Sequence, residues 1–430
     1  MHWFRRTLTA FIVVLFSSAP TALAQPPALP DEGPPLTLQA ALREALERNP
    51  ALTVLARAAA TAATRPAQEQ SLMPPMVEGQ IWQWPINTIN PWNVNMFMFG
   101  ISQELPGRGK RDLRAKLMQS EARMAEAEVP IKVREILGDV RRTYAELFVS
   151  RKSIAIYESS LALMRQFADI SQAKYEAGRI AQQDVLKAIL EISRMHKEIV
   201  ELREKARTAE AELNVLLDRP ADQAIGPVEE PRETAVLPPV AVLQARAIEA
   251  HPGLKAARLA IERAEAARVV NASDYQPDYV VRAGYMLMPT MTDAWTATFA
   301  ITWPRAPWSR KGIDAKLATA AAEVEETRAR VRAAENAVRL AVQQAYVRAQ
   351  SAAERAALLK TSLLPQSEQV LDGARVAYQT DRVDFLDLID NQRVLLSVQL
   401  DYWRALTELE QACADLERAV GAGLETITGL

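Results

Sequence analysis

Apolar residues recur at alternating steps of three and four through two long stretches of the chain. In the first stretch these positions are Val185, Ala188, Ile192, Met195, Ile199, Leu202, Ala206, Ala209, Leu213 and Leu216. Charged and polar residues occupy most of the positions between them. This spacing predicts a helix with one narrow apolar stripe, which is the pattern of a coiled coil. The same spacing returns 203 positions later, where Leu388 corresponds to Val185.

Each stripe is preceded by another long helical pattern and a short break. From about Asp112 to Lys174 the chain contains a single proline, Pro130, which should kink the helix, as should Pro365 in the second half. At ~1.5 Å per residue the first of these helices would be roughly 90 Å long. The breaks are Tyr175-Glu176-Ala177-Gly178-Arg179 and Tyr378-Gln379-Thr380-Asp381-Arg382. A break that contains Gly or Asp between two helical patterns predicts the tip of a helical hairpin.

Landmarks correspond along most of the two halves, which indicates an internal duplication. Asn49-Pro50 matches His251-Pro252 at an offset of 202, and the tips match at 203. We therefore predict two repeats, at residues 36–217 and 240–420. A Pro-rich segment (25–35) precedes them, a Pro-rich acidic linker (218–239) joins them at the surface, and a short tail (421–430) follows.

Residues 76–105 and 278–303 differ from the rest because aromatic and β-branched residues replace the helix formers. Each region predicts two strands joined by a loop. Four strands are too few to close a membrane barrel, since the smallest have about eight, so closure would need several copies. Tryptophans cluster near the predicted strand ends, as in the aromatic girdles at membrane interfaces: Trp82, Trp84, Trp92, Trp295 and Trp303. The alternative is a small sheet packed on helices.

The first 24 residues predict a secretory signal peptide. Arg5 and Arg6 precede a short apolar run, and Ala22-Leu23-Ala24 is a typical cleavage site. No stretch approaches the ~20 apolar residues of a transmembrane helix. Lys and Arg total 51 against 53 Asp and Glu, so charge gives no reason to expect nucleic-acid binding.

The sequence contains no recognisable catalytic constellation, so we expect no enzyme activity and no cofactor. It has no phosphate-binding loop, and its three histidines lie far apart. Cys413, the one cysteine, lies in a helical pattern and predicts a packed residue. Methionines in the strand regions (Met96, Met98, Met286, Met288 and Met291) raise the possibility of a soft-metal contact. Positions facing lipid or a lumen explain them better, and we predict no metal site.

Acidic residues gather at the second tip. Asp381, Asp384, Asp387 and Asp390 lie within ten residues, and the last three are spaced to share a helix face. Repeated around a symmetric ring, such carboxylates would form a constriction that attracts cations. Arg179 and Arg382 could bridge to acids on neighbouring helices and hold that ring shut. The alternative is a solvated helix start, where the helix dipole favours Asp.

The duplicated tips, the two Trp-rich hairpins and the Asn49-Pro50 and His251-Pro252 pairs resemble the TolC-type outer-membrane efflux family. The resemblance implies a mainly α fold with a small β part: a homotrimer with an α-helical barrel across the periplasm and a twelve-stranded transmembrane β-barrel, four strands per protomer. It also implies that Asp387 and Asp390 line the aperture, with Asp184 as the one acid that the first copy shares. Asp384 is a further candidate for the constriction because of its spacing. The tips, with Tyr175, Gly178, Arg179, Tyr378, Asp381 and Arg382, would gate the tunnel or meet a periplasmic adaptor protein.

These features together predict a passive exit duct in the outer membrane of a Gram-negative bacterium, embedded in outer-membrane lipid and extending into the periplasm. The duct would export drugs, metal ions or other small solutes, powered through the adaptor by an inner-membrane pump of the resistance-nodulation-division type. One alternative is the same channel serving type I protein secretion. A different kind of alternative is a soluble periplasmic coiled-coil scaffold, which would have no need of two aromatic hairpins.

Overall fold

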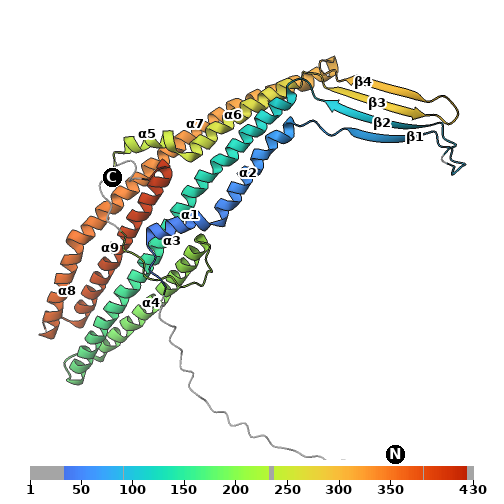
Figure 1. Cartoon of the computed structure of the whole chain (residues 1–430). Coiled ribbons are helices and arrows are strands. Elements are labelled where there is room, and N and C mark those ends of the chain that lie inside the picture. Colours follow the sequence, from blue (N-terminus) through green and yellow to red (C-terminus); the bar gives the residue numbers. More distant parts are fainter. Residues whose placement is uncertain (1–32, 91, 232–236, 381, 424–430) are drawn as a thin grey trace, which may run out of the picture.

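The computed structural model describes residues 33–90, 92–231, 237–380 and 382–423. The predicted signal peptide, Asp381 and most of the C-terminal tail therefore lie outside the described residues. The chain forms an elongated bundle of helices with a sheet at one end and two helical tips at the other (Figure 1). No helix among the described residues is long and apolar enough to cross a membrane.

The order of elements occurs twice along the chain. The first half contains α1 (Leu38–Arg48), α2 (Pro50–Gln70), β1 (Met76–Trp82), β2 (Met96–Leu105), α3 (Lys110–Glu176) and α4 (Gln182–Leu216). The second contains α5 (Val240–Ala250), α6 (Pro252–Ser273), β3 (Tyr279–Leu287), β4 (Ala294–Ile301), α7 (Pro307–Leu358), a π-helical turn η1 (Leu359–Leu363), α8 (Leu364–Gln379) and α9 (Phe385–Val420). The strands predicted from residues 76–105 and 278–303 are confirmed.

Asn49 separates the first two helices for a local reason. Its side chain accepts a hydrogen bond from Ala51 N–H at 3.0 Å, which caps α2, and Pro50 takes the first helical position, where no donor is needed. The Asn49 amide also donates to Leu216 O at the end of α4, at 3.0 Å. Asn49 thus ends α1 with its backbone N–H, which donates to Ala45 O, while its side chain caps α2 and ties this corner to α4.

The two long helices accommodate their prolines differently. α3 has 67 residues, about 100 Å at 1.5 Å per residue, and continues through Pro130. In the second half the α-helix gives way to η1, which ends two residues before Pro365, and Pro365 lies in the first turn of α8. A π-helical turn shifts the backbone hydrogen-bond pattern near the proline, which has no N–H group to donate. Of the two long helices, only the one in the second half is interrupted near its proline.

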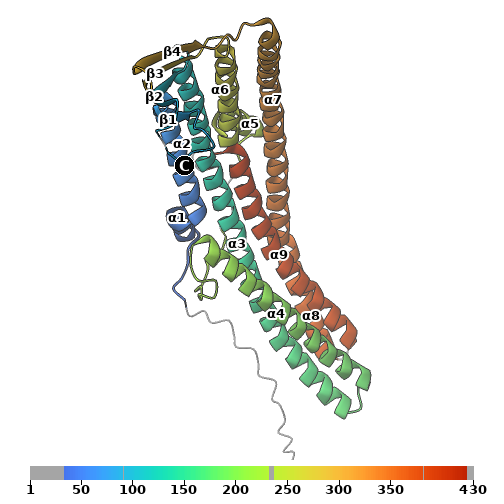
Figure 2. The same cartoon turned by 90° about the vertical axis from the view of Figure 1, so that its right-hand side faces the viewer.

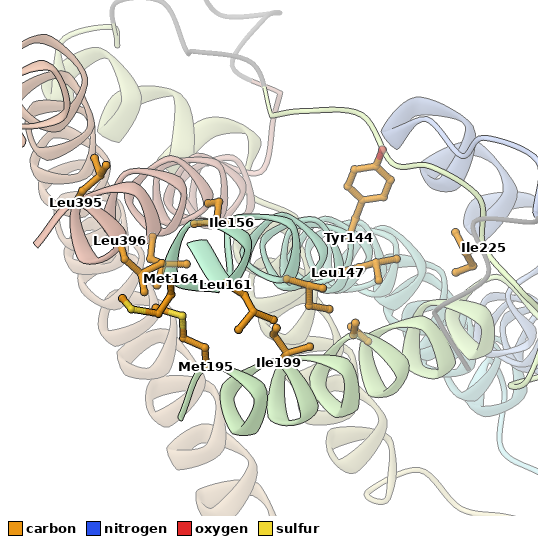
Figure 3. Close-up of a cluster of buried hydrophobic side chains, with 14 of the residues drawn as sticks. Tyr144, Leu147, Ile156, Leu161, Met164, Met195, Ile199, Ile225, Leu395 and Leu396 are labelled. Carbon is orange, nitrogen blue, oxygen red and sulfur yellow. The ribbon is translucent and has the colours of Figure 1, made fainter. Parts of the chain in front are cut away.

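The helices pack side by side, with α3 at the centre. It contacts α2 and α6 toward the sheet, and α4 and α9 toward the tips, while α7 lies along α6 and α9 (Figures 1 and 2). The apolar stripe of α4 is buried where α4 packs on α3. Its buried residues are Val185, Ala188, Met195, Ile199, Ala206, Ala209 and Leu213. Figure 3 shows Leu161 and Met164 of α3 beside Met195 and Ile199 of α4 and the α9 pair Leu395 and Leu396.

The linker between the halves is pinned to α3 rather than lying wholly at the surface. Ile225 is 1% exposed. The Tyr144 hydroxyl donates to Leu36 O and accepts from Glu229 N–H, both at 2.8 Å. Arg151 donates to Gly226 O at 2.7 Å. Buried backbone groups need hydrogen-bond partners, and Tyr144 and Arg151 of α3 provide some of them for the linker. The sequence pattern of the linker did not reveal these contacts.

The four strands form one antiparallel sheet in the order β1-β2-β3-β4. Directly opposite residues include Phe99 with Tyr285 and Tyr285 with Trp295, so odd-numbered strand residues share one face. That face holds Val77, Gly79, Ile81, Phe97, Phe99, Ile101, Gln103, Leu105, Tyr279, Val281, Ala283, Tyr285, Leu287, Trp295, Ala297, Phe299 and Ile301. We call it the apolar face. We call the even-numbered side, which includes Glu78, Gln80, Ser102, Glu104, Arg282, Thr296 and Thr298, the polar face.

Candidate functional site

The first tip is closed by a left-handed glycine. Gly178 has φ +70°, and its N–H donates to Tyr175 O at 2.8 Å while Arg179 N–H donates to Lys174 O at 2.9 Å. These two bonds satisfy the last carbonyls of α3 and form a Schellman motif. Glycine adopts this φ without strain, which explains its position in the break. α4 then begins at Gln182, with Asp184 in its first turn.

The second tip ends its helix in a similar way. Arg382 N–H donates to Ala377 O at 2.9 Å, five residues back, as Arg179 does in the first tip. Asp384 is the N-cap of α9, with extended backbone and no side-chain capping bond. The duplicated sequences therefore give corresponding turns, although Asp381 itself lies outside the described residues.

The two tips are joined through Tyr378, which is 2% exposed. Its hydroxyl lies 3.1 Å from the Ser171 hydroxyl on α3, and its ring centroid lies 5.6 Å from that of Phe385. The Lys174 ammonium lies 4.0 Å from the Tyr378 ring centroid and donates to Tyr378 O at 2.5 Å. Tyr175, the counterpart of Tyr378 in the first tip, is instead 39% exposed.

A pocket of about 340 Å³ lies between the tips, lined by Lys174, Arg179, Ile180, Asp184, Tyr378, Val383, Asp384 and Phe385. It brings together four of the residues predicted from sequence: Arg179, Asp184, Tyr378 and Asp384. Two carboxylates and two basic groups face the same space, so the pocket is polar with balanced charge. Tyr175 and Arg382 are exposed and do not line it.

The remaining acids follow along α9 in unlike surroundings. Asp387 is exposed, and no basic side chain among the described residues forms an ion pair with it. Asp390 is exposed but lies 3.2 Å from Arg393. The structure thus distinguishes two residues that the sequence treated as equivalent.

Arg393 also crosses from α9 to Glu191 of α4, an ion pair that the sequence prediction missed. Its Nη2 and Nε lie 2.6 and 3.1 Å from the two carboxylate oxygens. Glu191 is buried, and the Arg393 hydrogen bonds lower the pKa of its carboxyl despite that burial. Glu191 follows Ala188 by three and precedes Met195 by four, so a charge flanking the apolar stripe was the available signal.

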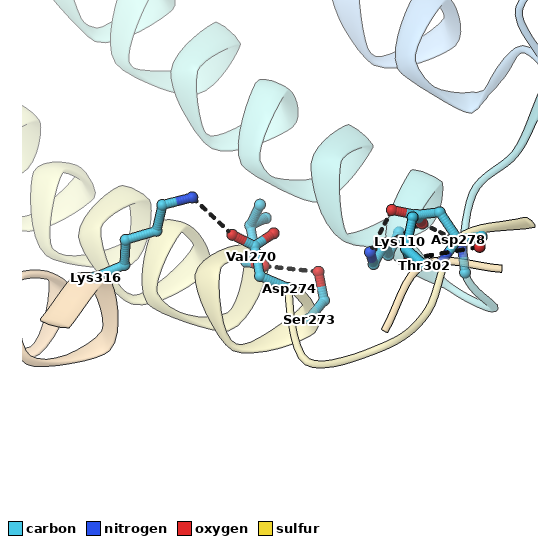
Figure 4. Close-up of polar contacts among 8 residues, drawn as sticks. Lys110, Val270, Ser273, Asp274, Asp278, Thr302 and Lys316 are labelled. Atoms are coloured by element: carbon cyan, nitrogen blue, oxygen red, sulfur yellow. Dashed lines mark hydrogen bonds and ion pairs between the residues drawn. The ribbon is translucent and has the colours of Figure 1, made fainter. Parts of the chain in front are cut away.

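The tryptophans lie at two levels of the sheet, and all five are exposed. Trp82, Trp84, Trp92 and Trp295 are at or beyond the strand ends farthest from the helices, and Trp303 is at the helix end, beside Trp308. Lys110 fixes the sheet to α3 at this helix end. Its ammonium is buried and lies 2.9 Å from both carboxylate oxygens of Asp278 (Figure 4).

Imidazole, thiolate and carboxylate ligands do not gather into a metal site in the described part of the chain. No group of three or more His, Cys, Asp or Glu residues there has a suitable arrangement. The balanced pocket at the tips and the exposed aromatic sheet at the opposite end are therefore the two features that a function must explain.

Comparison with known proteins finds similar sequences and structures among outer-membrane and metal-resistance proteins. The cobalt-zinc-cadmium resistance protein CzcC of Cupriavidus metallidurans is 22% identical over 317 residues, which cover 73% of this chain and 74% of CzcC. The outer-membrane channel OprN has 19% identity and a TM-score of 0.76, with 90% of each chain covered. The outer membrane protein VceC of Vibrio cholerae has 20% identity and a TM-score of 0.73, covering 90% of this chain and 97% of VceC.

The sequence model of outer membrane efflux proteins matches residues 41–219 and again residues 243–422. The two matches together span most of the chain, and they fall on the two halves whose elements repeat. The similarity that the tips and hairpins indicated is thus confirmed. The chain belongs to the outer membrane efflux protein family, whose members are TolC-like transport channels.

Proposed function

We propose that this chain is the passive exit duct of a tripartite efflux system, and that it works as a homotrimer in the outer membrane. The observation that carries the proposal is the sheet. The only polar groups among the side chains of its apolar face are the Gln103 amide, the Tyr279 and Tyr285 hydroxyls and the Trp295 indole N–H. Many of its large side chains are exposed, among them Phe99, Trp295 and Phe299. A face of this kind is unfavourable in water but suits the hydrocarbon core of a bilayer.

The edges of the sheet support assembly of several copies. β1 and β4 each have one neighbouring strand in the described chain. An open edge within a bilayer would leave backbone N–H and C=O groups without hydrogen bonds, so the edges must be paired. Three copies would supply twelve strands, above the roughly eight that the smallest membrane barrels need. The polar faces would then line a wet lumen, and the two levels of tryptophan would meet lipid at the two interfaces.

The helices would extend the duct into the periplasm, with the tips at the far end. The contact between Tyr378 and α3 is suited to holding that end narrow. In a trimer, Asp387 and Asp390 would lie near the constriction, together with Asp384 and Asp184. The exposed tip residues, including Tyr175 and Arg382, would be available to an adaptor protein that connects the duct to an inner-membrane pump of the resistance-nodulation-division type.

Metal ions are the substrate class that we favour, because a relative over most of this chain is a cobalt-zinc-cadmium resistance protein. The acids near the tips fit a cationic substrate. Drugs and other small solutes would pass the same duct, with selection made by the pump. The type I secretion alternative predicts instead that loss of the protein abolishes export of a polypeptide and leaves metal tolerance unchanged.

Planar-bilayer recording of the detergent-extracted protein, with its mass measured on the same sample, tests the proposal. We expect discrete channels from a trimer, with larger conductance when the tips open. A monomer or dimer that gives no conductance and washes from membranes in high salt would contradict the duct and favour the periplasmic scaffold.

A further inference from the structure

The polar face of the sheet is arranged in rungs that run across all four strands. From the helix side outward, the register aligns Met76, Ser102, Arg282 and Thr298, then Glu78, Gly100, Gly284 and Thr296, then Gln80, Met98, Met286 and Ala294. In the next rung Met96 is opposite Trp82. The ion-pairing and hydroxyl side chains of these rungs thus lie in the two nearer the helices, which also contain Met76, while the third rung places two thioethers opposite each other.

Three of these thioethers form one cluster, which we call the methionine cluster: Met96, Met98 and Met286. Met98 and Met286 are directly opposite each other on β2 and β3. Residues opposite each other in antiparallel strands have Cβ atoms roughly 5 Å apart, which flexible methionine side chains can easily span. Met96 follows on β2 in the adjacent rung. Ala294, beside Met286, has a small side chain that leaves room over the cluster.

The methionine cluster lies on the side of the sheet away from the apolar face. All three residues are half-buried, and they share their face with polar residues such as Gln80 rather than with the apolar face across the sheet. An ion pair between Glu78 and Arg282, with Nε and Oε1 3.1 Å apart, lies on the same face nearer the helices. The methionines are therefore on the side of the sheet that also carries the charged side chains of the strands, Glu78, Glu104 and Arg282.

Thioether sulfur is a soft, neutral ligand that selects soft ions such as Cu(I) over the harder divalent ions that oxygen and imidazole ligands prefer. We propose that the methionine cluster is a coordination site for soft monovalent cations, Cu(I) and its d¹⁰ analogue Ag(I), which pass along the polar face. Met98 and Met286 supply two sulfurs from neighbouring strands, and Met96 supplies a third. This inference rests on the proposed duct, in which the polar face lines the lumen and a trimer carries three such clusters.

Titration of the purified, detergent-extracted full-length protein with Ag⁺ in chloride-free buffer tests the site by calorimetry. The double variant Met98→Leu/Met286→Leu keeps apolar bulk but removes two sulfurs, so little change in stability is expected. We expect its tightest Ag⁺ affinity to fall by roughly tenfold or more. Met76→Leu, the same substitution on the same face two rungs away, is the matched control and should bind Ag⁺ like the wild type. Zn²⁺ should give no heat that depends on Met98 and Met286.

The outcomes separate this inference from the proposed duct. Unchanged Ag⁺ affinity in the double variant, or an equal loss in Met76→Leu, would overturn the methionine site even if all three proteins form channels. Channel recordings on the same samples report the duct independently, because conductance of potassium chloride does not require the cluster. Mass and circular dichroism of each variant establish that it assembles and folds like the wild type.

Discussion

Tyr175 and Tyr378 occupy corresponding positions in the two tips but have different roles. Tyr378 is buried against Ser171, Lys174 and Phe385, whereas Tyr175 is exposed. Tyr378 therefore forms the contact between the hairpins, and Tyr175 keeps an exposed side chain. Lys174 precedes Tyr175 in the first tip, but it contacts Tyr378 of the second tip. A residue of the first tip thus stabilises the position of the second.

Replacing Lys174 with Met should loosen the contact between the tips. The change removes the ammonium that lies over the Tyr378 ring and donates to its carbonyl. Such a contact contributes about 1 kcal/mol, so the ratio of open to closed channel should rise about fivefold in bilayer recordings. Tyr378→Phe is the control, because it retains the ring and the carbonyl and loses only the bond to Ser171. If Lys174→Met left the open fraction unchanged, Lys174 would not contribute to the stability of the closed channel.

Asp387 should contribute more to cation block than Asp390. The Asp390 carboxylate is partly neutralised by Arg393 at 3.2 Å, while Asp387 has no ion pair with any described residue. In single-channel recordings, Asp387→Ala should therefore relieve block by divalent cations more than Asp390→Ala does. Equal relief by the two variants, or greater relief by Asp390→Ala, would contradict the difference in their surroundings.

At the residue scale, sequence patterns found only part of the site. Arg179, Asp184, Tyr378 and Asp384 were predicted from the repeated tips, and they meet at one pocket. Lys174 and the pair of Glu191 with Arg393 were missed. Their partners are about two hundred residues away. The contacts depend on how α3 and α8, and α4 and α9, are rotated about their axes, which local spacing does not specify.

At the scale of elements, prediction was more successful because it relied on periodicity. The hairpins, the strands and the stripe of α4 each follow from a repeated spacing along the chain. The behaviour of the prolines was harder to predict, since α3 continues through Pro130 while η1 precedes Pro365. The outcome at a proline depends on whether neighbouring turns can rearrange, which is a property of packing rather than of sequence spacing.

The ion pair of Glu191 with Arg393 should make the link between α4 and α9 sensitive to acid. Its hydrogen bonds hold the pKa of Glu191 below the ordinary value of 4.5, so the folded state prefers the ionised carboxyl. Stabilisation from this pair is then complete above pH 4.5 and is lost as the pH falls through the lowered pKa. Hydrogen exchange in α4 and α9, corrected for its intrinsic pH dependence, should be constant from neutral pH to about 5 and should accelerate below 4.5.

Glu191→Gln provides the comparison for that experiment. The amide cannot ionise, so its exchange near the link should be faster than wild type at neutral pH and should change little as the pH falls. An identical acid response in the two proteins would mean that other carboxyl groups cause it. Asp390, which also contacts Arg393, remains in both proteins and so does not confound the comparison.

For the whole molecule, the main feature is the separation of two environments along one axis. The sheet, with its exposed apolar face, is at one end of the bundle, and the polar pocket is at the other (Figures 1 and 2). α3 passes from one to the other and is anchored to the sheet by Lys110 and Asp278. Sequence alone predicted the strands at one end and the helical tips at the other, because each region has its own composition. It could not identify the pairing of β2 with β3 across the repeats.

That pairing leaves β4 as an edge, and the edge makes a specific prediction about assembly. Thr302 N–H donates to Asp278 O at 2.9 Å, in line with the register in which Ile301 is opposite Tyr279. Because N–H directions alternate along a strand, Thr298 and Ala300 donate toward β3, while Ala297 and Phe299 present their N–H groups to the open edge. Proline at Ala297 should therefore spare the pairing with β3 and remove a donor needed by a neighbouring copy.

We expect Ala297→Pro to yield a protomer with native helix content that fails to form trimers and gives no conductance. Ala297→Val keeps the N–H group and should assemble normally. Ala300→Pro removes a donor that faces β3, so it should also weaken the sheet within the protomer. Mass measurement in detergent and circular dichroism distinguish these three results. A conducting trimer from Ala297→Pro would mean that the barrel does not close through this edge of β4, and the four-stranded sheet would then need another means of satisfying its outer hydrogen bonds.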